Sequence, residues 1–328
     1  MESTETANRD IHRSRGMYLL SFLTKYYIQS LLLISVVILA AVNPYFRSVG
    51  NLQNILLQAS FAGIGAAGMT LLIVSGAFDL SVAGLLGLCG VLISMLLPLL
   101  GAFLTFFAAV LLGVVLGSLN GVVVTKLRIP AFIATLGLMN IYLALAFIWT
   151  GGSRVVPISD PGFNSLGTGA LFGLPIPFLA MIAAYLGCYG ILNRSVYGRC
   201  LRAVGSSEVA ARTAGLPVDF IRILAFAIVG GCTALAGVFL GAELSSASAI
   251  MATGYELTVI AVVVIGGTSL KGGEGTLFGS FTGALFFAVI SSALNILNVA
   301  AYWQYVATGA FLISALGVQA LRSYIVIE

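Results

Sequence analysis

Charged residues are scarce in this chain of 328 residues. They make up 8% of it against 60% for hydrophobic residues, and the mean hydropathy is +1.10. A soluble domain normally carries about 25% charged residues, so this chain lacks the polar side chains that would cover a water-exposed surface. The composition therefore predicts an all-α integral membrane protein. Its apolar runs of roughly 18–25 residues fit membrane-spanning helices, because the strands of a barrel would alternate in segments of about ten.

Residues suited to catalysis, metal binding or nucleotide binding are also few. His12 is the only histidine, and the four cysteines lack the spacing of metal ligands. No G-x-x-x-x-G-K-[ST] sequence occurs, and we interpret the glycine-rich run 266–275 as a tight turn. No span centre holds a charged pair, which counts against an ion relay. We expect no catalytic residue, no metal site and no cofactor bound by this chain.

The apolar pattern predicts about ten membrane spans, with eight or nine spans and a re-entrant segment as the alternative. A polar tail, 1–27, precedes a single transmembrane domain, 28–328. Glycines four residues apart recur in several spans and allow close helix crossings, by default within one subunit. The spans are 28–43, 52–75, 80–98, 100–120, 130–150, 175–193, 219–241, 253–267, 275–298 and 303–321.

Basic residues sort unequally between the two sides of these spans. Of the 15 Lys and Arg residues, all except Arg47 and Arg154 fall on the side of the two termini. The positive-inside rule then places both termini and the charged loop 194–218 in the cytoplasm. Because the basic residues are confined to particular loops, the net charge of +4 does not indicate nucleic-acid binding.

The charged loop 194–218 contains the signals of a short helix. Ser206 or Ser207 is placed to be its N-cap, and Glu208 stands in the first turn, where the helix dipole favours an anion. Arg212 follows Glu208 by four residues, and Gly215 is a stop signal. Two interpretations stay open: a docking site for a soluble partner, or an ordinary loop whose arginines only set the topology.

Polar residues within the spans could line a path for a neutral, hydroxyl-rich solute, or could only hold helices together. Asp79 lies in a break of the apolar pattern and could instead cap the next helix. The span 253–267 offers a helix of about 13 residues, which rises only about 20 Å, and short spans of this kind often lie near a substrate path or gate. The candidate path or gate residues are Gln58, Asp79, Asn120, Thr135, Asn140, Tyr255, Glu256 and Asn295.

Several short motifs follow one another along nearly the whole chain. They are Ser75-Gly76 with Asp79–Val82, Asn120-Gly121, Pro130–Gly137, Gly198-Arg199 with Ala203 and Gly205, Gly254–Leu257, and Gly266–Leu270 with Gly272-Gly273, Gly275 and Thr276. In this order the chain resembles the permease subunits of bacterial ABC importers for monosaccharides, of the ribose, arabinose, galactose and xylose type. Where that family usually has Gly-Gly-Asn, this chain has Gly205-Ser206-Ser207.

The resemblance implies an importer of several subunits that is located in the bacterial inner membrane and surrounded by lipid. Its partners would be a second permease subunit, a cytoplasmic ATPase that holds ATP and Mg²⁺, and a periplasmic or extracellular sugar-binding protein. The charged loop would be the coupling loop that receives the ATPase motion, through Arg199, Arg202, Gly205, Glu208, Ala211, Arg212 and Gly215. The alternative is an autonomous secondary carrier or facilitator of a small polar solute.

Overall fold

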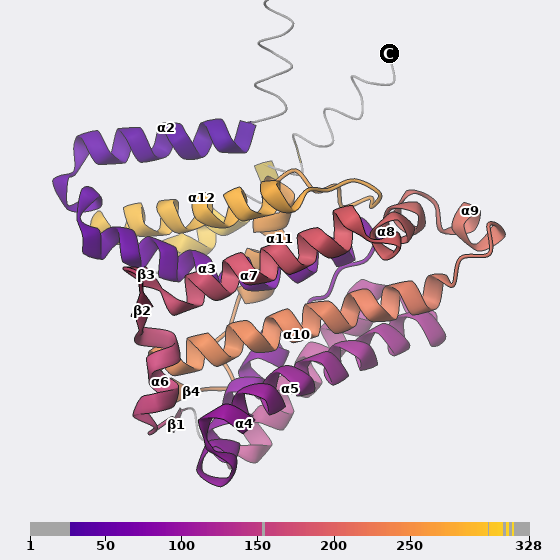
Figure 1. Ribbon diagram of the computed structural model, residues 1–328, viewed down its shortest axis with the longest axis horizontal. Coiled ribbons are helices and arrows are strands. Elements are labelled where there is room, and N and C mark those ends of the chain that lie inside the picture. The colour runs from indigo at the N-terminus through magenta and orange to yellow at the C-terminus, as the bar shows by residue number, and fades with distance from the viewer. Residues whose placement is uncertain (1–26, 153–154, 301, 311–312, 315–316, 318–328) are drawn as a thin grey trace, which may run out of the picture.

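The computed structural model describes residues 27–152, 155–300, 302–310, 313–314 and 317, and it is mostly helical (Figure 1). The predicted tail 1–27 lies outside this part of the chain except for Tyr27. Of the predicted span 303–321, residues 303–310 lie in a helical stretch that begins at 302, and the rest is described only at 313–314 and 317. The long elements are α2 (Tyr27–Val42), α3 (Val49–Val74), α4 (Val82–Lys126), α5 (Ala131–Trp149), α7 (Ile176–Tyr189), α10 (Val218–Leu244), α11 (Tyr255–Ile265) and α12 (Leu277–Ile296).

Shorter elements connect these helices. They are the helical turns η1 (Pro44–Arg47) and η2 (Gly190–Arg194), the helices α6 (Pro161–Thr168), α8 (Val196–Ser206) and α9 (Glu208–Thr213), and the strands β1 (Val156–Pro157), β2 (Ala170–Leu171), β3 (Leu174–Pro175) and β4 (Ser246–Ala247). β1 pairs antiparallel with β4, and β2 with β3. The segment 151–174 was predicted only as the connection between two spans. The prediction missed α6 and its cap, Asp160, which accepts from the Phe163 N–H at 2.7 Å.

Six of the described helices are long and apolar enough to cross a membrane: α3, α4, α5, α7 together with η2, α10 and α12. The multi-span helical class is therefore as predicted. Two predicted spans, 80–98 and 100–120, fall within α4, which breaks at Gly101 (φ 71°, ψ 170°). Beyond that break α4 continues to Lys126, past the predicted end, because no helix-breaking residue interrupts the apolar run.

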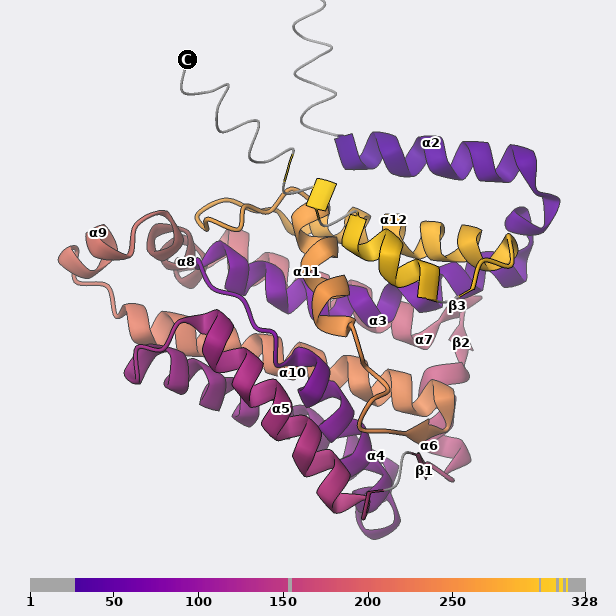
Figure 2. The same ribbon diagram turned by 180° about the vertical axis from the view of Figure 1, so that it is seen from behind.

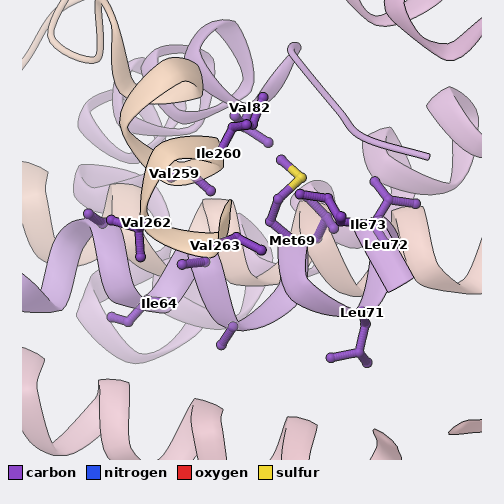
Figure 3. Close-up of a cluster of buried hydrophobic side chains, with 14 of the residues drawn as sticks. Ile64, Met69, Leu71, Leu72, Ile73, Val82, Val259, Ile260, Val262 and Val263 are labelled. Carbon is purple, nitrogen blue, oxygen red and sulfur yellow. The ribbon is translucent and has the colours of Figure 1, made fainter. Parts of the chain in front are cut away.

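Helix α3 lies at the centre of the molecule and contacts α7, α10, α11 and α12. Its side chains from Ile64 to Val74 are buried all round, as expected for a helix without a polar face. Figure 3 shows Met69 and Ile64 of α3 against Val259 and Val263 of α11. Since lipid tails are as apolar as these side chains, close van der Waals contact holds such helices together rather than removal from water.

Glycines allow a close helix contact between the second half of α4 and α10. A Cβ on Gly230 of α10 would overlap the carbonyl oxygen of Gly113, and a Cβ on Gly117 would overlap the carbonyl of Phe226. The backbones of the two helices therefore touch without intervening side chains. This confirms that Gly113 and Gly117 serve packing inside one subunit.

Two helices begin only after stretches of non-helical chain. The segment 75–81 runs from the end of α3, near α8, to the start of α4 in the interior of the molecule (Figure 2). Likewise, residues 248–254 lead into α11, which has only 11 residues. The prediction of a short helix within 253–267 is confirmed. Non-helical backbone at such positions is tolerated in membrane proteins where surrounding protein satisfies it.

The contact between α4 and α10 can be tested with two glycines. We expect Gly117→Ala to lower the stability by about 1–3 kcal/mol, because the added methyl group meets backbone that cannot rotate away. Gly137→Ala on α5 is the control, because nothing lies within 4 Å of the new methyl group. Thermal unfolding in detergent measures both, and equal midpoints for the two variants would contradict the packing described.

Candidate functional site

Helix α8 presents one face to the molecule and the other to solvent. Ser195 caps it, since its Oγ accepts from the Gly198 N–H at 3.0 Å. Leu201 and Val204 are buried beneath it, whereas Arg199 and Ala203 are exposed. The sequence predicted only the next helix, although Ser195 and the apolar spacing of Leu201 and Val204 were signals for this one.

Helix α9 forms the two-turn helix predicted in the charged loop. Ser207 is its N-cap, and its Oγ accepts from the Ala210 N–H at 3.2 Å. Ala211 is buried beneath α9, and the Leu216 N–H donates to the Ala211 carbonyl at 3.0 Å. Gly215 ends the turn with a φ of +81°, a conformation that glycine adopts without strain.

Glycines join the end of α8 to two other segments. A Cβ on Gly205 would overlap the carbonyl oxygen of Val74, the last residue of α3, and would lie 2.5 Å from the Gly273 nitrogen. The Gly273 N–H itself donates to the Val74 carbonyl at 2.8 Å. We call this contact of α8, α3 and the 266–276 connection the glycine junction. Arg202 adds a hydrogen bond of 3.3 Å to the Gly275 carbonyl.

A chain of ion pairs fixes α9 to the helix ends beside it. Glu208 accepts from Arg222 at 2.5 Å and from Arg212 at 3.0 Å. Arg212 also reaches Asp219 at 2.6 Å, and Asp219 pairs with Lys126 at the end of α4 at 3.2 Å. Arg222 further donates to the Ser75 carbonyl at 3.4 Å. The network connects α4, α9, α10 and the segment 75–81.

The Glu208 carboxyl group of this network is held in its ionised form. Partial burial opposes ionisation of Glu208, but the hydrogen bonds and charges of Arg222 and Arg212 outweigh it and lower its pKa. Any stability from the pairs of Glu208 is therefore present at neutral pH and lost as the pH falls through its lowered pKa. Because Lys126, Arg212 and Glu208 retain 60%, 49% and 40% exposure of their side chains, water screens these pairs and each is worth little alone.

The outer surface of α8 and α9 is apolar and cationic. Val209 is 77% exposed and Val196 is 66% exposed, while Arg199 and Arg212 also face solvent. We call the end of the molecule that carries α8, α9 and the connections 127–130 and 266–276 the basic end. Exposed aliphatic residues beside arginines are typical of a protein interface.

A second polar cluster lies buried in the interior, at the start of α4. Asp79 accepts from the Asn120 amide at 2.9 Å and from the Ser81 N–H at 2.7 Å. The Asn120 amide also donates to the Ser81 hydroxyl at 2.7 Å, and Tyr142 donates to the Asn120 Oδ1 at 2.6 Å. Thr135 accepts from the Leu80 N–H at 3.1 Å. Asp79, Asn120 and Thr135 are fully enclosed.

This interior cluster joins three of the eight predicted path or gate residues. Asp79 accepts from the N–H of Ser81, the N-cap residue of α4, and from no N–H in the first turn of the helix, so it does not cap α4 as the sequence allowed. Tyr142 was missed, although Thr135, Leu138 and Tyr142 share one face of α5 at helical spacing. In lipid a buried carboxylate needs partners of this kind.

The other five predicted residues are spread over the molecule. Tyr255 is buried and donates to the Phe61 carbonyl at 2.9 Å, which holds the start of α11 against α3. Glu256 beside it is half-buried. The remaining three are partly or fully exposed, with local partners: Gln58 donates to Asn54, Asn140 to the Leu136 carbonyl, and Asn295 accepts from Gln304.

These features define a multi-span helical membrane protein whose loop helices, α8 and α9, expose an apolar and cationic surface. Residues 51–316 match the family described as the branched-chain amino acid transport system permease component, and the chain belongs to this family. The ribose import permease protein of Haemophilus influenzae is 37% identical over 288 residues, 87% of this chain and 89% of that protein. The ribose import permease protein of Escherichia coli K12 is 37% identical over 292 residues, 87% and 90% of the two chains.

The L-arabinose transport system permease protein of Escherichia coli K12 is 37% identical over 273 residues, 83% of each chain. These relatives confirm the resemblance found in the sequence motifs. The chain is a multi-pass permease subunit of a bacterial ABC importer, and the ATPase of such a system is a separate component. No solved structure matches this fold.

The stabilising role of the interior cluster can be tested by removing the side-chain amide of Asn120. We expect Asn120→Ala to cost about 1–3 kcal/mol of stability, because in this enclosed site Asp79 loses a donor and Tyr142 loses its 2.6 Å acceptor. Asn140→Ala on α5 is the matched control, because that amide is exposed and bonds only its own helix. In an Asp79→Asn background the effect of Asn120→Ala should shrink. Equal unfolding midpoints for Asn120→Ala and Asn140→Ala would disprove this role.

Proposed function

We propose that this permease carries a small neutral sugar, a monosaccharide or related polyol, into the cytoplasm, driven by ATP hydrolysis on a separate ATPase with bound Mg²⁺. Support comes from relatives that are named for ribose and L-arabinose transport. A neutral, hydroxyl-rich solute needs hydrogen bonds and no counter-charge. The proposed partners are a second copy or relative of this permease, the ATPase and a sugar-binding protein outside the cell.

The proposed orientation places the basic end in the cytoplasm, with about ten spans in all. Arg47 is the one described basic residue away from the basic end; those at it are Lys126, Arg128, Arg194, Arg199, Arg202, Arg212, Arg222 and Lys271. This distribution supports the positive-inside orientation. In this proposal 1–27 is a cytoplasmic tail that precedes the single domain 28–328.

The glycine junction is the observation that carries the proposed coupling mechanism. Gly205 places α8 in backbone contact with the end of α3 and with the connection between α11 and α12. The ion pairs of Glu208 tie α9 to α10 and, through Arg222, to the carbonyl of Ser75. A motion imposed on α8 and α9 by the ATPase would therefore move the ends of several helices together.

The segment 75–81 extends the proposed coupling into the interior. Its first residues contact Arg222 and Gly205, and its last residues, Asp79 to Ser81, belong to the interior cluster. We propose that Asp79, Asn120 and Thr135 hold the segment 75–81, which would act as a gate. Tyr255 and Glu256, at the start of α11, are proposed to border the path, with Gln58, Asn140 and Asn295 as weaker candidates.

Two variants distinguish docking of the ATPase on α8 and α9 from transmission of its motion to the helix ends. Val209→Asp should abolish co-purification of the ATPase and sugar uptake, because it places a desolvated charge in the proposed interface. Gly205→Ala should retain the ATPase but lose most uptake, because the added methyl group separates α8 from α3. Co-purification, ATP hydrolysis and labelled sugar uptake in vesicles measure the difference.

The control for these variants is Phe172→Asp, which charges an equally accessible side chain far from α9, 93% exposed. It should leave ATPase co-purification unchanged. Full uptake by Val209→Asp would refute the docking surface. Uptake by the permease alone in liposomes, without any ATPase, would instead favour the carrier alternative.

The orientation can be tested by labelling single cysteines. Ser206→Cys should react with a membrane-impermeant maleimide only in inside-out vesicles, and Phe172→Cys only from outside intact spheroplasts. Both side chains are exposed, so burial should not prevent the reagent from reaching either cysteine. The parent chain retains its four native cysteines as the background control. The reverse pattern of labelling would overturn the proposed orientation.

A further inference from the structure

A cavity of about 690 Å³ opens at the basic end, between α9, the start of α10 and the connection between α4 and α5. Its charged lining consists of Arg128, Arg212, Arg222 and Glu208. The remaining wall consists of Gly76 and Ala77 of the segment 75–81, Val124 and Thr125 of α4, and the run 129–131. Glu208, Arg212 and Arg222 also belong to the ion-pair network, whereas Arg128 does not.

The charge of the cavity is not balanced within the described chain. Glu208 is shared by Arg212 and Arg222, and Arg212 also pairs with Asp219. Arg128 has no hydrogen bond or ion pair to any described residue, although it lines the same cavity. Three guanidinium groups against one carboxylate in the lining leave a positive excess that favours an anion.

The backbone at Arg128 is unusual for an arginine. Its φ is +55°, a left-handed conformation that glycine and asparagine adopt much more readily. The chain therefore places a charged side chain where backbone conformation alone would favour another residue. Such strained positions are enriched at functional sites.

Exposed apolar side chains flank the lining residues Arg128 and Ala131 in the sequence. Leu127, beside Arg128, is 64% exposed, and Phe132 and Ile133, at the start of α5, are 52% and 61% exposed. They stand where α4 ends and α5 begins, so polar lining and apolar surface meet at the helix ends. This is the arrangement expected at the boundary between headgroups and acyl chains.

We propose that this cavity binds the phosphate headgroup of an anionic phospholipid. The Arg128 guanidinium, with its planar set of donors, would bind the phosphate, and Arg222 would contribute charge from the opposite wall. The acyl chains would lie along Leu127, Phe132 and Ile133. The site is independent of which solute is transported, but it presumes that α4 and α5 cross the membrane.

An acidic segment of a soluble partner would satisfy the same cations, but it would not account for the exposed apolar side chains beside Arg128 and Ala131. The test uses the full chain in neutral detergent with phosphatidylglycerol, phosphatidylcholine, inorganic phosphate or polyglutamate as the probe. Phosphatidylglycerol should raise the unfolding temperature well above the effect of phosphatidylcholine. Arg128→Asn should weaken the apparent affinity for phosphatidylglycerol about tenfold or more, since it removes a charge-assisted contact.

Arg128→Asn suits the local backbone, so its stability without lipid should match or exceed that of the parent. Lys271→Asn is the control, because it removes an exposed charge at the basic end outside the cavity and should keep the full lipid effect. The proposal is overturned if Arg128→Asn binds phosphatidylglycerol as the parent does. It is equally overturned if phosphate alone or polyglutamate gives the Arg128-dependent shift and phosphatidylglycerol does not.

Discussion

Close backbone contact at glycines is the constraint on which this structure depends. In lipid, apolar side chains gain little from leaving their surroundings, so helix association rests on how closely the atoms approach. Gly117 and Gly230 bring α4 onto α10, and Gly205 brings α8 onto the last carbonyl of α3. The same device thus serves packing inside the bundle and attachment of the loop helices to it.

Non-helical segments are the second constraint, because their backbone groups need partners inside the protein. The segment 75–81 meets this need at both ends: Ser75 bonds Arg222, and Leu80 and Ser81 bond the Thr135 hydroxyl and Asp79. A segment held at both ends transmits displacement better than one held at one end. In the proposed mechanism this explains why a buried carboxylate is retained where a neutral residue would be less costly.

Much of the helical layout was predictable from the sequence, because long apolar runs indicate helices and glycines between them indicate where helices end. The start and the end of α9 were predictable from Ser207 and Gly215, respectively, whose roles are local. The break within α4 at Gly101 was anticipated, but its extension to Lys126 was not. Tyr142 and the partners of Asp79 depend on contacts between α4, α5 and the segment 75–81, which no local pattern encodes.

The two sides of the α8 and α9 pair differ in a way that fits a transmitting element. The inner side is fixed by Leu201, Val204 and the glycine junction, where a single methyl group would displace the helix. The outer side exposes Val209 and Arg199, which could be matched by a partner without disturbing the inner contacts. Rigid inner contacts matter because a packed contact shifts as a unit, so force applied outside reaches the helix ends rather than being absorbed by the loop.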